Sequence, residues 1–528
     1  MSDFTRRLVL LFLAATLLAG CARSQPASQG GAGGTLTRAM TTEPSSLDPQ
    51  GAAASGLNLV LPYLFDTLVY RDTDNTYKPY LADSWQASPD GRVVTFMLKK
   101  GVTFHDGSPL NAAAVVFTFQ RFQKTGTKSP IYAGVRDIAG IQAIDDLTVR
   151  FSFDKPSATF LSTLSQPYAA ILSPSAVQAA GEDLARKATG TGLFKLEEWK
   201  PGVSMTLVRN PDYAWAPPAV KNKGPAQFER LVFKVIPDAN TQLSSLLAGE
   251  VDVAFLNEPA HFQKLEADKS VQVYRETLDS LIYLGYNCAR APFNEVKVRQ
   301  ALSYAVNKAE IVQTALGGLG EIADTLLPPT LPGYNAELKR YGQGYDPARA
   351  KTLLTEAGFT QSADGSWQRD GKTLGGTLLT STRAPNGSIA EVLQSQFKKI
   401  GVTFAIQQLD SAAVMNATTE GKFDLLLWRY DWNDPDVLNM YLSSSRIKQT
   451  NRVSYSNQAA DALFERGLRE MDPKARNQIY YDAQKLLLTE APWQPLYVPV
   501  EGLAVSNRVQ GLAIGAMGRM LVNDVTLR

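Results

Sequence analysis

Strand and helix signals alternate from Thr35 to the C-terminus of this 528-residue chain, and this alternation constrains the fold more than any other feature. An apolar strand is expected over 231–236, a helix over 238–248 that ends at a glycine, and a second apolar strand over 251–256. Such a strand-helix-strand unit is typical of layered α/β proteins. A hydrophobic fraction of 44% is enough for a large core. We therefore predict an α/β fold, of about three domains by length.

Capping residues predict where further helices begin. Asn111 precedes an apolar helical face, and Asn307 with Glu310 three residues later has the spacing of a capping box within a helical stretch over 298–316. Asp346 and the following proline predict the start of another helix, closed by a glycine. These caps place helices between the expected strands, as an α/β fold requires.

The N-terminus has the pattern of an export signal. Arg6 and Arg7 precede an apolar run over 8–18 that is too short to span a bilayer, and small residues follow it. Cys21 comes directly after Leu-Ala-Gly, which resembles the lipobox of bacterial lipoproteins, where this cysteine is acylated and becomes the mature N-terminus. We predict a signal peptide over 1–20 and a lipid on Cys21; a plain secretion signal or an uncleaved anchor are the alternatives.

The composition limits the possible partners of the chain. Residues 21–35 are small, polar and Gly-rich, so we expect a flexible linker between a lipid anchor and the folded body. The formal net charge of +2 is nearly balanced, which gives no reason to expect a nucleic-acid partner. Cys288 is the only cysteine besides Cys21, so we expect no intrachain disulfide and a buried, inert Cys288.

Signals of an enzyme are weak. The chain has two histidines, His105 and His261, and no HExxH, GxSxG or Cys/His cluster, so we expect no metal site, no cofactor and no catalytic residues. The glycines over 365–373 resemble a phosphate-binding loop with one residue too many, and we interpret them as a polar hairpin turn. The glycines over 318–320 follow a helix rather than a strand, so we interpret them as a helix terminus.

Several blocks of the chain resemble one family. The block Leu81-Ala-Asp-Ser-Trp-Gln-Ala-Ser-Pro-Asp-Gly91, continued over 94–109, resembles the signature of the family 5 extracellular solute-binding proteins, the oligopeptide-, dipeptide- and nickel-binding proteins of ABC importers. Further blocks match in the same order at 190–199, 249–253, 292–306, 345–359, 431–435 and 491–497.

The resemblance implies a two-lobed fold of the periplasmic-binding-protein type, with a hinge, an extra inserted domain and a ligand enclosed between the lobes. The implied division places lobe I at 36–77, 190–283 and 496–528. Domain II would be residues 78–189, and lobe III residues 284–495.

Peptide-binding members of this family hold the amino terminus of the ligand with an aspartate, and the resemblance aligns Asp431 with it. A ligand ammonium would pair such a carboxylate; the alternative is that Asp431 stabilises its own loop. Trp428, Tyr430 and Trp432 could provide aromatic walls, although strand alternation would bury some of them in the core.

Dipeptide-binding members also hold the ligand carboxylate with an arginine, and the resemblance aligns Arg383 with that residue; the alternative is a surface arginine in a loop. A guanidinium fork suits a carboxylate. Arg429 is a second candidate, either as a clamp or as an internal ion-pair partner of a nearby aspartate. Tyr497, in the last matching block, completes the predicted set of ligand-binding residues.

The resemblance implies a lipid-anchored, extracytoplasmic binding subunit of an ABC importer that captures peptides or similar zwitterionic solutes, not an enzyme. As a monomer, it would dock on a permease driven by a cytoplasmic ATPase. The stretch 423–431 is two residues shorter than the peptide-binding pattern, so a non-peptide solute (an opine, an oligosaccharide or a chelate) remains an alternative. Two more functions stay open, a receptor for a membrane sensor and an exported hydrolase.

Overall fold

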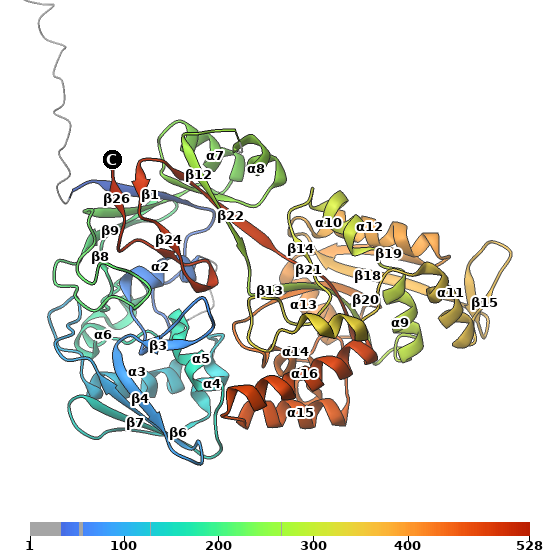
Figure 1. Ribbon diagram of the computed structural model, residues 1–528, viewed down its shortest axis with the longest axis horizontal. Helices are drawn as coiled ribbons and strands as arrows, with labels where there is room; N and C mark the ends of the chain where they lie inside the picture. The colour runs from blue at the N-terminus through green and yellow to red at the C-terminus, as the bar shows by residue number, and fades with distance from the viewer. Residues whose placement is uncertain (1–32, 52–55, 127, 266) are drawn as a thin grey trace, which may run out of the picture.

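The computed structural model describes residues 33–51, 56–126, 128–265 and 267–528. The predicted signal peptide, Cys21 and most of the predicted linker lie outside these residues. The described chain forms two bodies joined by a pair of strands, with an additional sheet packed beneath the first body in the view of Figure 1.

The first body is built on a seven-stranded mixed sheet with the order β12-β22-β11-β1-β10-β9-β8. Its central strand β1 (Thr35–Met40) is parallel to β10 (Arg230–Val235) on one side and to β11 (Val253–Leu256) on the other. The predicted strand-helix-strand unit is therefore present, with the N-terminal strand inserted between its two strands. The other strands and the helices of this body are β8 (Phe194–Lys200), β9 (Ser204–Arg209), β12 (Val271–Thr277), β22 (Val500–Ser506), α2 (Leu57–Leu64), α7 (Ala239–Leu247) and α8 (Pro259–Leu265).

The additional sheet is four-stranded and antiparallel, with the order β4-β5-β7-β6. One hydrophobic core runs through this sheet and the first body, from Leu36 in β1 to Phe96 and Phe151. The two parts therefore share their interior. The elements here are β4 (Ala82–Ala87), β5 (Val93–Leu98), β6 (Ile138–Ala143), β7 (Thr148–Phe153), α3 (Ala112–Thr125), α4 (Tyr132–Arg136), α5 (Phe160–Ser165), α6 (Pro174–Ala180), η1 (Pro167–Ala169) and η2 (Gly181–Ala185).

The second body has a six-stranded sheet with the order β14-β21-β13-β20-β18-β19. Alternate side chains of β13 enter two different cores, Leu284 on one face and Tyr283 on the other. The strands are β13 (Ser280–Tyr286), β14 (Glu321–Ile322), β18 (Gly375–Ser381), β19 (Thr403–Leu409), β20 (Leu425–Asp431) and β21 (Trp493–Val498). The first face packs against α9 (Val296–Tyr304), α10 (Lys308–Ala315), α11 (Pro347–Glu356) and α12 (Asn386–Lys399). The second packs against α13 (Ser411–Thr419), α14 (Val437–Leu442), α15 (Gln458–Arg469) and α16 (Pro473–Glu490).

The chain crosses between the two bodies twice, and these two crossings form the hinge. β12 continues into β13 and β21 into β22, and the Leu278 N–H donates to the carbonyl of Pro499 at 3.0 Å. The chain changes sheet next to Leu278 and Pro499, so residues 280–283 and 496–498 belong to the sheet of the second body. Strand pairing thus moves the sheet boundary a few residues from the expected 283/284 and 495/496; the rest of the domain division stays a prediction.

The remaining strands and helices are short. The glycine-rich stretch over 365–373 forms the polar hairpin that was predicted, within the three-stranded sheet β15-β16-β17. These elements are β2 (Val69–Arg71), β3 (Tyr77–Pro79), β15 (Thr360–Gln361), β16 (Trp367–Arg369), β17 (Lys372–Thr373), β23 (Val509–Gln510), β24 (Ala513–Ile514), β25 (Met520–Leu521), β26 (Thr526–Leu527), η3 (Ala336–Tyr341), η4 (Ser444–Arg446) and η5 (Ala516–Gly518).

Candidate functional site

The end of β20 next to the hinge has an open edge. β18 pairs with β20 only at Leu425 and Leu426, and no other described strand pairs with that side. On the opposite side the Trp432 N–H donates to Asp279 of the hinge at 3.0 Å. Because antiparallel pairing alternates, the backbone groups of Arg429 and Asp431 face away from β13, toward the open edge. Such an edge can accept an extended chain as an additional strand.

Asp431 is the last residue of this strand, and its exposed carboxylate pairs with Arg429. The Nε of Arg429 donates to Oδ2 of Asp431 at 2.9 Å, and its Nη2 donates to Oδ1. The side chain of Asp431 is 58% exposed and that of Arg429 is 22% exposed. Arg429 is thus an internal ion-pair partner of an aspartate, one of the two roles predicted for it, and Asp431 keeps an accessible face.

Arg383 lies near this pair, in the exposed loop that follows β18. It interacts electrostatically with Arg429, Asp431, Glu501 and Tyr497. The Tyr497 ring is buried in β21, and burial raises the pKa of its phenol to about 12. The structure therefore brings four of the predicted residues, Asp431, Arg429, Arg383 and Tyr497, to one place at the hinge.

Two carboxylates that sequence reasoning missed complete this cluster from the first body. Glu501 in β22 is half-buried, and burial raises its pKa although Arg429 and Arg383 oppose the shift. Glu276 in β12 is also half-buried; burial and the charges of Asp279 and Glu501 raise its pKa to about 7, against the backbone N–H of Gly518. No local motif marks these glutamates, because only the crossing of the hinge strands brings Glu501 to Arg429 and Glu276 opposite Glu501.

The three predicted aromatic residues do not surround Asp431. Tyr430 is 1% exposed and donates its hydroxyl to the carbonyl of Leu326 at 2.6 Å, so it belongs to the core. Trp428 is half-buried on the same sheet face, and the indole of Trp432 donates to Asp436 at 2.7 Å. Strand alternation explains the separation, since residues 428 and 430 point to the face opposite to 429 and 431.

Two further contacts join the parts of the molecule away from the strand edge. Arg71 of β2 donates to Asp279 at 2.5 Å and to the carbonyl of Thr330 in the second body at 3.3 Å. Asn433, two residues after Asp431, accepts hydrogen bonds at Oδ1 from Ser162 at 3.0 Å and from Gln166 at 2.8 Å, both on the four-stranded-sheet side.

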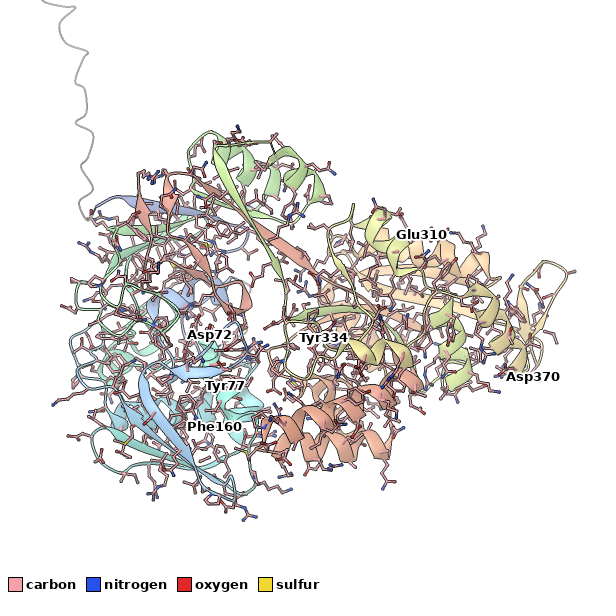
Figure 2. The ribbon with its side chains drawn as sticks, in the orientation of Figure 1. Asp72, Tyr77, Phe160, Glu310, Tyr334 and Asp370 are labelled. Carbon is pink, nitrogen blue, oxygen red and sulfur yellow. The ribbon has the colours of Figure 1, made fainter. Side chains whose placement is uncertain are left out.

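Tyr77 in β3 confirms that these two sides are close. Burial and the charge of Asp434, which lies in the second body, raise the pKa of Tyr77 to about 12. Figure 2 shows Tyr77 and Tyr334 on the sides of the two bodies that face each other. The strand edge thus lies between the hinge and a second zone of contact.

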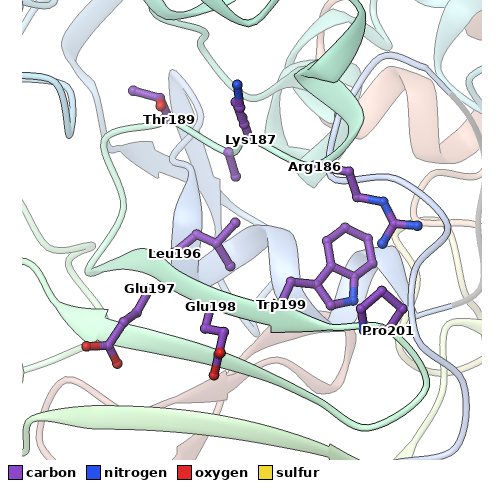
Figure 3. A pocket seen from close by; sticks show the side chains of 9 residues that line it. Arg186, Lys187, Thr189, Leu196, Glu197, Glu198, Trp199 and Pro201 are labelled. Carbon is purple, nitrogen blue, oxygen red and sulfur yellow. The ribbon is translucent and has the colours of Figure 1, made fainter.

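A separate surface hollow of about 560 Å³ lies on the first body, near β8 (Figure 3). Most of its charges are paired: Glu197 pairs with Arg230 at 2.8 Å, whereas Arg186 lies over the Trp199 ring at 4.0 Å. Glu198 pairs with Lys200 at 2.8 Å and Lys187 with Asp183 at 3.2 Å. Among the charged side chains that line this hollow, only Arg186 has no carboxylate partner within the described residues.

The described part of the chain has neither a metal-binding cluster nor a membrane-spanning helix. No group of three or more His, Cys, Asp or Glu side chains there is arranged to hold a metal ion. No helix among those residues has the length and hydropathy needed to cross a bilayer. Burial lowers the pKa of His105 to about 4 and raises that of Cys288 to about 11, so both are neutral at pH 7.

Comparison with known proteins defines the class. Residues 76–450 match the family model described as bacterial extracellular solute-binding proteins, family 5, and the chain belongs to this family. It is therefore the extracytoplasmic substrate-binding component of an ABC importer, working with a permease and an ATPase, and not an enzyme.

The names of individual relatives state different ligands. The chain is 31% identical to heme-binding protein A of Haemophilus influenzae over 469 residues, 84% of this chain and 82% of the relative. It is 29% identical to the dipeptide-binding protein of Pseudomonas aeruginosa over 542 residues, 97% of this chain and 98% of the relative. The solved structure of NikA from Brucella suis in complex with Fe(III)-EDTA has a TM-score of 0.83 at 26% identity and covers 94% of this chain and 100% of NikA.

Proposed function

We propose that this protein captures peptides or similar zwitterionic small solutes in extended form on the open edge of β20. The observation that carries the proposal is that this edge ends at Asp431 beside the hinge. Backbone groups of the edge would bind any extended peptide, whatever its side chains, and a carboxylate at its end would bind a ligand ammonium. The similarity to a dipeptide-binding protein over 97% of this chain supports the same ligand class.

Arg383 is the proposed partner of the ligand carboxylate. Its guanidinium is exposed, lies within electrostatic range of Asp431 and makes no hydrogen bond within the described chain that would compete with a ligand. A short zwitterionic ligand would therefore place its ammonium at Asp431 and its carboxylate toward Arg383. Closure of the hinge would bring Glu276 and Glu501 of the first body over the same ligand.

We also propose that the protein is a monomer anchored to the membrane by a lipid on Cys21. The basic and apolar segment ahead of Leu-Ala-Gly-Cys21 supports the anchor. The Gly-rich stretch that follows would give the folded body a reach of about 20 Å from the membrane surface.

A second candidate ligand is an anionic solute without an ammonium group. The ion pair of Arg429 with Asp431 favours it, because a ligand ammonium would have to compete with this internal cation. Such a solute would bind Arg383 and leave the pair intact.

Native mass spectrometry of the full-length protein, purified in detergent without denaturation, separates the two candidates. A retained series of di- to pentapeptide masses is expected. A single retained non-peptide mass would overturn the peptide proposal, and an empty protein would be titrated with Ala-Ala and Ala-Ala-Ala by calorimetry, where no heat of binding would overturn it as well.

A further inference from the structure

Arg452 is a half-buried arginine of the second body without a carboxylate partner among the described residues. Its Nε is buried and has no hydrogen-bond acceptor, and its Nη1 reaches only the hydroxyl of Thr418, at 3.5 Å. Most half-buried guanidinium groups in proteins are paired, because desolvation of an unpaired charge is costly. By contrast, Arg476, a half-buried arginine of the same body, pairs with Asp434 at 2.6 Å.

The backbone on both sides of Arg452 is held in place. Asn451 and Val453 are each 1% exposed. The Asn451 amide donates to the carbonyls of Ser443 and Tyr455 at 2.9 and 2.8 Å, and the carbonyl of Val453 accepts the Cys288 N–H at 2.8 Å. These bonds fix the residue between them, so that Arg452 is presented from a rigid segment.

The guanidinium of Arg452 lies over the ring of Trp428, with 5.5 Å between its central carbon and the ring centroid. A ring covers one face of a guanidinium and leaves the N–H groups at its edge free to donate in plane, which suits a carboxylate. Arg452 is therefore oriented as a donor even though the described chain provides no anion for it.

This arginine is electrostatically linked to the proposed ligand site. Tyr441 interacts both with Arg452 and with Asp431 and Arg429; burial is the largest cause of its raised pKa, Asp431 adds to it, and the two arginines oppose it. Trp428 is three residues before Asp431 in β20, a distance of about 10 Å along a strand. Arg452 thus lies beside the open edge, on the face to which Trp428 points.

An extended ligand on this edge projects alternate side chains to the two faces of the sheet. We propose that Arg452, with Trp428 and Tyr441, forms a subsite that binds the carboxylate side chain of such a ligand near its amino terminus. This inference rests on the proposed function and adds a preference to it: among peptides of equal length, those with a glutamate in the first or second position bind most tightly.

Calorimetry on the full-length protein in detergent tests this preference. The probes are Glu-Ala-Ala against Gln-Ala-Ala, and Ala-Glu-Ala against Ala-Gln-Ala, which differ only in charge. The wild-type protein is expected to bind the better glutamate peptide about tenfold more tightly than its glutamine partner, as a charge-assisted bond gives. Arg452→Gln should reduce that ratio to below about twofold while glutamine peptides bind as before.

Two further variants keep the test specific. Arg452→Lys retains the charge without the fork and should keep part of the preference. Arg340→Gln is the matched control, because Arg340 is an exposed arginine of the same body that lies over the ring of Tyr341 at 5.1 Å. It should bind every peptide like the wild type.

The outcomes are distinguishable. Equal wild-type affinities within both peptide pairs, or a preference that survives Arg452→Gln, would refute the subsite and leave the peptide function standing. Failure of the wild-type protein to bind any of the four peptides would refute the proposed function and the subsite together.

Discussion

Arg429 donates to the carboxylate of Asp431 two residues further along the same strand, so the proposed ammonium anchor already has a cationic partner within the protein itself. The pair is accessible on the aspartate side, where 58% of the side chain is exposed. A surface ion pair of this kind contributes about 1 kcal/mol or less, and a ligand ammonium that also gains backbone bonds can displace it or share the carboxylate. The ion pair therefore lowers the affinity for a ligand ammonium slightly but does not block the site.

Removal of the Asp431 carboxylate should weaken peptide binding. We expect Asp431→Asn to lower the affinity for Ala-Ala-Ala by about 1.5–3 kcal/mol, the range for a hydrogen bond to a charged group. Isothermal calorimetry measures the change. N-acetyl-Ala-Ala-Ala, which has no ammonium, is the control: it should bind weakly to the wild-type protein and no worse to the variant. An unchanged affinity for the free peptide would remove Asp431 from the site.

Arg383→Gln should selectively weaken the binding of short ligands that end in a free carboxylate. The loss expected for Ala-Ala is about 1–3 kcal/mol, because one charged donor is removed. The amidated dipeptide should bind the wild-type protein and the variant alike, since it has no carboxylate to lose. If the variant binds Ala-Ala with wild-type affinity, Arg383 is only a surface arginine of its loop.

The raised pKa of Glu276 predicts a pH-dependent stability. Below about pH 4.5 this carboxyl is protonated in both the folded and the unfolded chain, so it has no effect. Between about 4.5 and 7 the unfolded chain releases the proton while the folded chain, with a pKa of about 7, retains it, so stability falls as the pH rises. Above pH 7 the penalty is complete.

Glu276→Gln should remove this penalty. The variant is expected to be more stable than the wild type at pH 8, by about 1 kcal/mol after allowance for partial exposure, and equal to it at pH 4.5. Urea unfolding at the two pH values measures the difference. A variant that is equally less stable at both values would contradict the assignment.

Asn433→Ala should loosen the contact between the second body and the four-stranded-sheet side. The substitution leaves Ser162 and Gln166 without their acceptor, and we expect a loss of about 1–3 kcal/mol in unfolding free energy. Bound peptide should also dissociate faster in stopped-flow displacement. Asn416→Ala, on the exposed side of α13, is the control. Identical dissociation rates for wild type and Asn433→Ala would show that the contact does not restrain opening.

Cys21→Ser should release the protein from the membrane. Without the thiol there is no acceptor for the lipid, so the protein is expected in the soluble fraction after cell lysis and centrifugation. Cys288→Ser is the control, since the Cys288 thiol is half-buried and desolvation raises its pKa to about 11, and this variant should stay in the membrane fraction. A Cys21→Ser protein that remains with the membrane would contradict the lipobox assignment.

Local sequence signals predicted the helix ends well. Asn111, Asp238 and Asp346 each accept a backbone N–H at the start of the expected helix. The capping box at Asn307 is only half formed. Its side chain accepts the Glu310 N–H, but its own N–H donates to Gln396, and the Glu310 carboxylate accepts from Gln396 and Lys399. A contact with a distant helix replaced the local one, and no pattern around Asn307 signals it.

The candidate site was only partly predictable, because some of its contacts also join residues that are distant in the sequence. Asp431, Arg429 and Arg383 belong to segments whose family resemblance is visible in the sequence. Glu276 and Glu501 are separated from them and from each other by long stretches of chain, and only the strand crossing at Leu278 and Pro499 brings them together. Among the aromatic residues of β20, Tyr430 lies in the core, as strand alternation allowed, and a ligand contact of Trp428 stays a prediction, because periodicity shows which residues share a sheet face but not what covers that face.

The common interior of the first body and the four-stranded sheet has a consequence for heat denaturation. Residues from Leu36 to Phe151 and Val505 belong to one apolar cluster, so neither part can lose its packing while the other keeps it. The second body has cores of its own, and it is joined to the rest by the hinge strands and by polar contacts such as those of Asn433 and Arg71. A calorimetric scan should therefore resolve two cooperative melting units in a chain for which three domains are predicted.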